Sequence, residues 1–227
     1  MLRYHLFMLV TNLWTRTAYR MRVVGKEHVP TTGRCIVVAN HPGKLLADLA
    51  IFPALWPRRR PVLVAYGQVM GRGVPRTMAW GAKVFPMIIA QPRGRGNAVA
   101  ATLEIMRALE REEAVFFMPE GEVSWTGRLN PARPAAAWAA LRANAPIIPV
   151  GLVGTYDVWP RWQEKMNRIG KITVRIGRPF TLADTKPQRI TPEMLDRAGE
   201  RIMAEIRRLL EEEKLATWTR AFGCSSL

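Results

Sequence analysis

The sequence predicts an α/β fold in which a largely parallel central sheet is flanked by helices. Short apolar runs alternate with stretches of helical periodicity along most of the chain. Strands of a parallel sheet are covered on both faces, so they are apolar throughout, and these runs have that character. No linker or low-complexity stretch interrupts the 227 residues, so we expect one domain over residues 1–227.

Residues 1–22 are predicted to form an N-terminal amphipathic helix that lies in a membrane interface. Large apolar side chains are interspersed there with Arg3, Arg16, Arg20 and Arg22. A helix packed on the domain is the alternative. No apolar stretch reaches the length that crosses a bilayer, and no small-residue cleavage site follows, so we expect neither a spanning helix nor a signal peptide.

The remaining elements follow from hydrophobic periodicity and from turn residues. Strands are predicted at residues 21–24, 35–40, 61–66, 85–90, 114–118, 147–153 and 171–176. Helices are predicted at residues 45–56, 96–111, 134–144 and 191–216, and residues 71–81 are ambiguous. Pro149 is expected to interrupt its strand. The last helix has a clear start, with Thr191 as N-cap and Pro192 at the first helical position.

The chain is strongly basic. It has 34 Lys and Arg against 18 Asp and Glu, a formal net charge of +16. Such a charge favours a polyanionic partner, either nucleic acid or an anionic membrane surface. No recognised nucleic-acid-binding module accompanies the arginines, so we expect no nucleic-acid partner; a compositional bias toward arginine explains part of the excess. Two cysteines make no disulfide framework, and the cytoplasm is the expected compartment.

One histidine is the best candidate for chemistry. His41 ends the apolar run 35–40, and Asp48 follows seven residues later. None of the three serines lies in a nucleophile elbow, and no His or Cys pair has metal-site spacing. A histidine with a carboxylate partner can instead take a proton directly from a substrate hydroxyl. Glu120 follows another strand, so both segments are predicted to face one crevice beyond the carboxyl ends of the strands.

Four segments, in order, resemble the glycerophospholipid acyltransferase family of the 1-acylglycerol-3-phosphate acyltransferase type. They are VGKEHVPTTGRCIVVANHPGKLLAD (24–48), FPMIIAQPRGRG (85–96), FMPEGEVSWTGRLNPARP (117–134) and IIPVGLVGT (147–155). Gly177-Arg178-Pro179 matches a small motif that often follows them. The resemblance covers about residues 20–182.

The resemblance implies a single acyltransferase domain that moves a fatty acyl group from acyl-CoA or acyl-carrier protein to the free hydroxyl of a lysophospholipid. It implies His41 as general base with Asp48 as its partner. The implied acceptor-binding residues are Arg93, which is associated with the acceptor phosphate, the neighbouring Arg95, Glu120 and Gly121. No metal and no cofactor is expected, because the thioester donor is a co-substrate. We expect a peripheral enzyme on the cytoplasmic face of an anionic membrane.

Two departures from the family pattern bear on this expectation. Six residues separate His41 from Asp48, where the family usually has four. The extra residues are expected to form a longer turn, from which Lys44 contacts a phosphate. Glu122 and Val123 replace the usual Thr-Arg. This change weakens the expectation of 1-acylglycerol 3-phosphate as acceptor and leaves room for another lysolipid, such as a lysophospholipid with a head group or an amine-bearing lipid that pairs with Glu122. A catalytically silent relative that binds anionic lipid is the alternative function.

Overall fold

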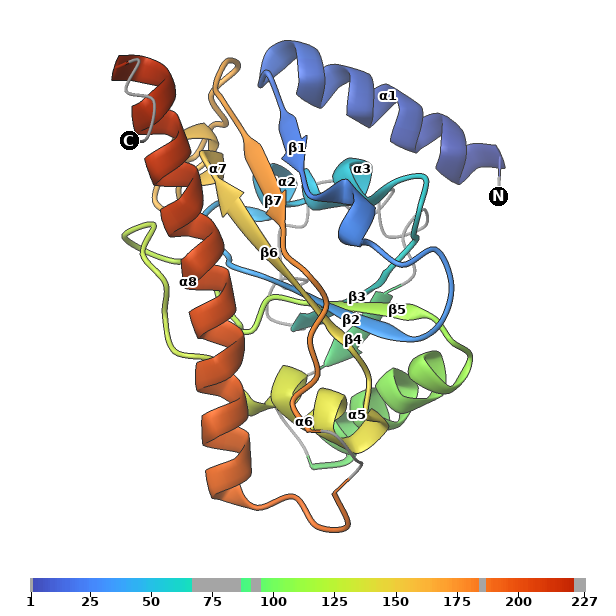
Figure 1. Cartoon of the computed structure of the whole chain (residues 1–227). Coiled ribbons are helices and arrows are strands. Elements are labelled where there is room, and N and C mark those ends of the chain that lie inside the picture. The colour runs from blue at the N-terminus through green and yellow to red at the C-terminus, as the bar shows by residue number, and fades with distance from the viewer. Residues whose placement is uncertain (1, 67–86, 91–94, 184–186, 223–227) are drawn as a thin grey trace.

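The computed structural model describes residues 2–66, 87–90, 95–183 and 187–222 (Figure 1). Its elements are α1 (Leu2–Ala18), β1 (Arg22–Val24), the 3-10 helix η1 (Lys26–His28), β2 (Cys35–Ala39), α2 (Leu45–Asp48), α3 (Ile51–Leu55), β3 (Val62–Tyr66), β4 (Met87–Ala90), α5 (Arg95–Glu110), β5 (Ala114–Phe117), α6 (Pro134–Ala143), β6 (Ile147–Val153), α7 (Thr155–Val158), β7 (Thr173–Ile176) and α8 (Pro192–Phe222).

The strands form a seven-stranded sheet in the order β1-β7-β6-β2-β5-β3-β4. All neighbouring pairs are parallel except β6 and β7. The five strands from β6 to β4 in this order therefore run in one direction, and their carboxyl ends lie along one edge of the sheet. This arrangement confirms the predicted α/β class with a largely parallel sheet.

Helices cover both faces of the sheet, which explains why its strands are apolar throughout (Figure 1). On β2, Cys35, Val37 and Ala39 pack in the core beneath α1 and α3. Ile36 and Val38 point the other way, into a second core formed with α5, α6 and α8. All five side chains are fully buried, so β2 is the centre of the fold and its end is rigidly placed.

Several elements differ from their predicted form. The first helix ends at Ala18 rather than residue 22, and the helix predicted over residues 45–56 is divided into α2 and α3. Pro149 does not interrupt β6, because it pairs in register with Val38 of β2 and its carbonyl accepts from the Gly177 N–H just after β7. The short elements η1 and α7 were not predicted. The ambiguous segment 71–81 lies outside the described residues.

The last helix begins where its capping residues predict. The backbone N–H of Met194 donates to Thr191 Oγ1 at 3.3 Å, which satisfies one of the free donors of the first turn. The helix continues to Phe222, beyond the predicted end at residue 216. Ala198, Ile202 and Ile206 lie on its buried face and belong to the second core.

The first helix has two different faces. Tyr4 and Met8 are buried against the domain. Away from the domain, the exposed apolar side chains are Leu6, Leu9, Val10, Leu13 and Trp14. The packed alternative therefore describes one face of α1, and the interfacial role of the other face stays a prediction. Among the described helices, none has the length and apolar character needed to cross a membrane.

Candidate active site at the carboxyl edge of the sheet

Three hydrogen bonds hold His41 at the carboxyl end of β2. Its backbone N–H donates to Glu120 Oε1 at 2.7 Å, and its carbonyl accepts from the Ser124 N–H at 2.8 Å. Its ring Nδ1 lies 2.7 Å from Asp48 Oδ2. Among the described residues, none forms a hydrogen bond with Nε2. With Nδ1–H donated to a carboxylate, the lone pair is on Nε2, which is the form a general base requires.

The longer spacing between His41 and Asp48 closes through a compact turn. Asp48 lies at the end of the one-turn helix α2, and both of its carboxylate oxygens are 3.2 Å from the Gly43 N–H. A Cβ atom at Gly43 would lie 2.5 Å from the Thr155 carbonyl oxygen, so only glycine fits at this approach. The Lys44 N–H donates to the Trp159 carbonyl at 2.7 Å. The two extra residues are thus absorbed without separating the pair.

Burial shapes the electrostatics of both carboxylates. Asp48 is completely buried, and this desolvation raises its pKa, while the hydrogen bonds from His41 and Gly43 oppose the rise. Burial likewise raises the pKa of Glu120, against hydrogen bonds from the backbone of Asn130 and His41. A buried carboxylate with a raised pKa next to an imidazole is typical of functional sites.

The Glu120 carboxylate connects two segments of the backbone. Its Oε1 accepts from His41 N–H and its Oε2 from Asn130 N–H at 2.8 Å, so it ties the loop after β5 to the end of β2. Gly121 has a φ of 71°, and a Cβ atom there would lie 2.4 Å from Arg133 Cδ. Glycine therefore lets the Arg133 side chain lie over this backbone. Contact of Glu120 or Gly121 with an acceptor stays a prediction.

The other residues predicted to bind substrate are Lys44, Arg93 and Arg95. The Lys44 ammonium donates to the Gln163 carbonyl and lies 5.2 Å from the centre of the Trp159 ring, so it anchors the loop after α7 beside the His41 turn. Its contact with a phosphate stays a prediction. Arg93 lies outside the described residues, and Arg95 is the first residue of α5, with a side chain that is likewise not described.

Sequence reasoning missed two residues that position His41. The Asn40 side chain donates to the Leu152 carbonyl at 3.0 Å and accepts from the Leu152 N–H at 2.7 Å, which clamps β2 to β6 just before His41. Ser124 supplies the backbone donor to the His41 carbonyl. An asparagine directly before the histidine was the only available signal, and it does not reveal its partner 112 residues away.

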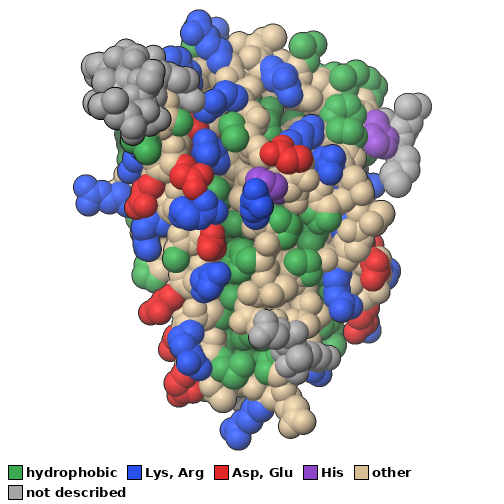
Figure 2. All heavy atoms as spheres, viewed as in Figure 1, with side chains coloured by type: hydrophobic (Ala, Val, Ile, Leu, Met, Phe, Trp, Pro, Cys, Tyr) green, Lys and Arg blue, Asp and Glu red, His purple; other side chains and the backbone are tan. Residues whose placement is uncertain are grey.

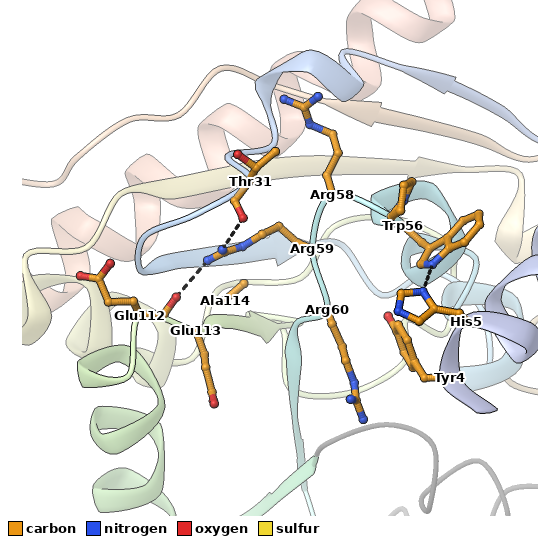
Figure 3. A pocket seen from close by; sticks show the side chains of 11 residues that line it. Tyr4, His5, Thr31, Trp56, Arg58, Arg59, Arg60, Glu112, Glu113 and Ala114 are labelled. Atoms are coloured by element: carbon orange, nitrogen blue, oxygen red, sulfur yellow. Dashed lines mark hydrogen bonds between the residues drawn. The ribbon is translucent and has the colours of Figure 1, made fainter. Parts of the chain in front are cut away.

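A cavity of about 260 Å³ lies at the opposite, amino edge of the sheet (Figure 3). Its basic residues are Arg58, Arg59 and Arg60. Arg59 donates to the carbonyls of Thr31 and Glu112, and Arg58 to that of Val29. These guanidinium groups stabilise loops, and the cavity is remote from His41. In the part of the chain that the structure describes, no group of His, Cys, Asp and Glu side chains is arranged to hold a metal ion.

The basic residues on the face drawn in Figure 2 are not gathered in a single patch. On the face shown in Figure 2, Lys and Arg side chains are spread widely and alternate with acidic ones along α8. Ion pairs between Arg208 and both Glu205 and Glu212 illustrate this mixing. On this face the positive charge is therefore spread over the surface and is not concentrated in one groove. The net charge of +16 attracts anionic surfaces without defining one binding site there.

Known proteins are similar to this chain in sequence and in fold. A family model described as Acyltransferase matches residues 20–153. The chain is 25% identical over 186 residues to the chloroplastic 1-acyl-sn-glycerol-3-phosphate acyltransferase BAT2 of Brassica napus, covering 78% of this chain and 51% of the relative. It is 26% identical over 178 residues to 1-acyl-sn-glycerol-3-phosphate acyltransferase alpha of Mus musculus, covering 78% and 60%. The chain thus spans little more than half the length of these relatives.

A solved structure confirms the architecture. The crystal structure of the 1-acyl-sn-glycerophosphate acyltransferase PlsC from Thermotoga maritima matches with a TM-score of 0.68 and 21% sequence identity, over 93% of this chain and 78% of that one. At this identity the match establishes the fold. The family model covers more than half of the chain and includes His41, Asp48 and Glu120. The chain therefore belongs to the acyltransferase family.

Proposed function

We propose that this protein transfers a fatty acyl group from a thioester donor, acyl-CoA or acyl-carrier protein, to the free hydroxyl of a lysophospholipid. The acceptor is 1-acylglycerol 3-phosphate or a related lysolipid. One observation carries the proposal: a buried carboxylate holds His41 Nδ1 at 2.7 Å, and no described residue bonds to Nε2 at the carboxyl edge of the sheet. The names of the relatives support the same reaction class.

The geometry suits direct transfer with a single base. His41 Nε2 takes the proton of the acceptor hydroxyl as its oxygen attacks the thioester carbonyl carbon. The tetrahedral intermediate collapses, the carbon–sulfur bond breaks, and the imidazolium returns the proton to the thiolate. Asp48 stabilises the imidazolium between these steps and holds the ring in its reactive tautomer. The products are the diacylated lipid and the free thiol, so the protein needs no nucleophile of its own.

The test is substrate-dependent release of thiol. The protein is incubated with acyl-CoA or acyl-carrier protein and a mixed set of lysolipids, and the products are identified by mass spectrometry. We expect His41→Ala to lower turnover by about 10²–10⁴-fold with an unchanged melting temperature. His5→Ala is the matched control, because it removes an exposed imidazole from the amino edge of the sheet. Wild-type turnover in His41→Ala would reject the mechanism.

The silent lipid-binding alternative rested partly on the unusual spacing between His41 and Asp48. Because the two side chains are in contact, that spacing no longer favours the alternative. Binding to anionic vesicles without turnover across the whole panel of donors and acceptors would favour it. The same panel shows which donor carrier is used.

We further propose that the protein rests on the cytoplasmic face of an anionic membrane. The exposed apolar face of α1 and the net charge of +16 support this location. Replacing both Leu9 and Leu13 by Glu should strongly reduce co-sedimentation with phosphatidylglycerol-containing vesicles. Replacing the exposed Leu103 of α5 by Glu is the control. Unchanged sedimentation of the α1 variant would reject an interfacial role for this helix.

A further inference from the structure

A carboxylate beside the candidate active site lies between two guanidinium groups. Glu122 Oε2 is 2.9 Å from Arg161 Nη1, and Glu122 Oε1 is 3.6 Å from Arg133 Nη2. We call these three residues the Arg133–Glu122–Arg161 triad. The side chains of Arg133 and Arg161 are 51% and 32% exposed, so a ligand can reach both. The mechanism above uses none of the three.

Arg161 is fixed in place by more than its ion pair. Its Nη1 also donates to the Val123 carbonyl at 2.9 Å, and its guanidinium lies 4.2 Å from the centre of the Trp125 ring. These contacts use one nitrogen and one face of the group. Among the described residues, none accepts a hydrogen bond from Nε or Nη2, so Arg161 keeps donors for a ligand in a preorganised orientation.

A single peptide group connects Arg161 to the backbone of His41. The Val123 carbonyl that accepts from Arg161 and the Ser124 N–H that donates to His41 are the two ends of one peptide unit. Hydrogen bonds of 2.9 and 2.8 Å on either side place Arg161 Nη1 within about 8 Å of the His41 carbonyl oxygen. In 1-acylglycerol 3-phosphate, the free hydroxyl and the phosphate are on neighbouring carbons, so a phosphate-binding residue must lie close to the base.

The charge of the triad determines which head group it suits. Two guanidinium groups and one carboxylate leave a net charge of +1, which repels an ammonium group and attracts a phosphate. The Arg161 guanidinium keeps the pKa of Glu122 below its usual value, so the carboxylate stays ionised as an internal counter-ion. A phosphate brings more negative charge than Glu122 and can replace it between the two arginines.

We propose that Arg161 and Arg133 bind the phosphate of the lysolipid acceptor. In the absence of the acceptor, Glu122 pairs with both guanidinium groups, and the phosphate displaces it on binding. Arg161 thereby supplies the cation that the apolar Val123 does not, from a turn 38 residues later in the chain. This assignment rests on the proposed acyltransferase function and makes Arg161 a determinant of acceptor specificity.

Steady-state kinetics with 1-acylglycerol 3-phosphate test the proposal. Arg161→Ala should raise KM for this acceptor about 10–100-fold, with kcat and the KM for acyl-CoA changed little. Arg161→Lys should be intermediate, because an ammonium keeps the charge but loses the fork. Arg168→Ala, which removes an exposed arginine from the same loop, is the control. Equal effects of the Arg161 and Arg168 variants, or a raised KM for acyl-CoA instead, would overturn the proposal.

Glu122→Gln tests the counter-ion role in the opposite direction. It should lower KM for 1-acylglycerol 3-phosphate about threefold, because the phosphate no longer competes with a carboxylate. It should leave KM for an uncharged monoacylglycerol unchanged. A raised KM for the phosphate acceptor, or loss of activity only with an ethanolamine-headed lysolipid, would show that Glu122 itself contacts the head group and would overturn the proposal.

Binding separates this proposal from the proposed function. Calorimetry with sn-glycerol 3-phosphate should show binding to wild type that Arg161→Ala weakens about 10-fold or more and Arg168→Ala does not, with melting temperatures as a check on folding. This result without turnover would reject the function and keep the phosphate site. Turnover with no effect of Arg161→Ala on either binding or KM would keep the function and reject the site.

Discussion

The two edges of the sheet carry similar residue types but differ in what holds the imidazole. At the amino edge, Arg59 is bonded to backbone carbonyls, and His5 Nδ1 accepts from Trp56 at 3.1 Å. At the carboxyl edge, the Nδ1 of His41 is bonded, while among the described residues no partner meets its Nε2. Both edges combine an imidazole, guanidinium groups and tryptophan, but of these two imidazoles only that of His41 is paired with a buried carboxylate.

The difference shows that folding decides which imidazole is held in the tautomer that a general base requires. The arginines of the amino edge donate to backbone carbonyls and so tie neighbouring loops together. At the carboxyl edge, the Ser124 N–H donates to the His41 carbonyl, and the Gly43 N–H donates to the Asp48 carboxylate. We therefore expect substitutions at the carboxyl edge to change activity and those at the amino edge to change stability.

The largest expected effect is that of Asp48→Asn. An asparagine amide donates to His41 Nδ1, which moves the ring proton to Nε2 and removes the base. We expect kcat to fall by about 10²–10⁴-fold, measured as thiol release, with the fold intact by circular dichroism. A kcat near that of wild type would show that the reaction does not require the His41–Asp48 pair.

The same variant has a predictable effect on the pH dependence of stability. Burial raises the pKa of Asp48 in the folded protein, so the native state holds its proton more tightly than the unfolded state. Wild-type stability therefore falls as pH rises from the unfolded pKa through the folded pKa, and Asp48→Asn lacks this fall. Urea unfolding should show the variant at least as stable as wild type at neutral pH, with the difference shrinking toward pH 4 (about the unfolded pKa). The opposite trend would mean that the contact with His41 outweighs burial.

Arg59→Ala tests the amino edge. Three backbone carbonyls lose their donor, those of Thr31, Gly33 and Glu112, and we expect the free energy of unfolding to fall by about 2–4 kcal/mol. The kcat of the folded protein should stay within about twofold of wild type, since the site is remote. Lost activity with unchanged stability would assign function to this edge.

Gly43→Ala should have an intermediate effect on stability and a clear one on activity. Its Cβ would press on the Thr155 carbonyl, so the turn must shift at a cost of about 1–3 kcal/mol, and the His41–Asp48 geometry moves with it. We expect kcat to fall about tenfold or more. Gly199→Ala in α8 is the control, because its Cβ has room, 3.4 Å from Ala132 Cβ. Equal behaviour of the two variants would show that the turn tolerates a side chain.

Arg60→Ala should have the smallest effect. Its guanidinium lies over the Tyr4 ring at 4.5 Å on an exposed side chain, a contact that contributes about 0.5–1 kcal/mol. Urea unfolding should show a loss of this size, and thiol release should not change. A large loss of activity would remove the contrast between the two edges.

Most elements could be predicted from the sequence because their signals are local. Apolar runs marked the strands, and Thr191 with Pro192 marked the start of α8. The division of residues 45–56 into two helices was not predicted. Pro53 lacks the N–H that a continuous helix would donate to Leu49, and Phe52 donates to that carbonyl instead. His41, Asp48 and Glu120 could be named in advance, while the partners of Asn40 and Lys44 could not.

The sequence by itself determined the α/β class and the candidate base, since periodicity and a histidine at the end of a buried strand are properties of neighbouring residues. Only the tertiary structure decided whether Asp48 reaches His41 across six intervening residues. It also brought Arg161 to the backbone of Val123, where the sequence shows no cation. Both contacts depend on how the loops at the carboxyl edge pack together, and packing between distant segments leaves no periodic pattern in the chain.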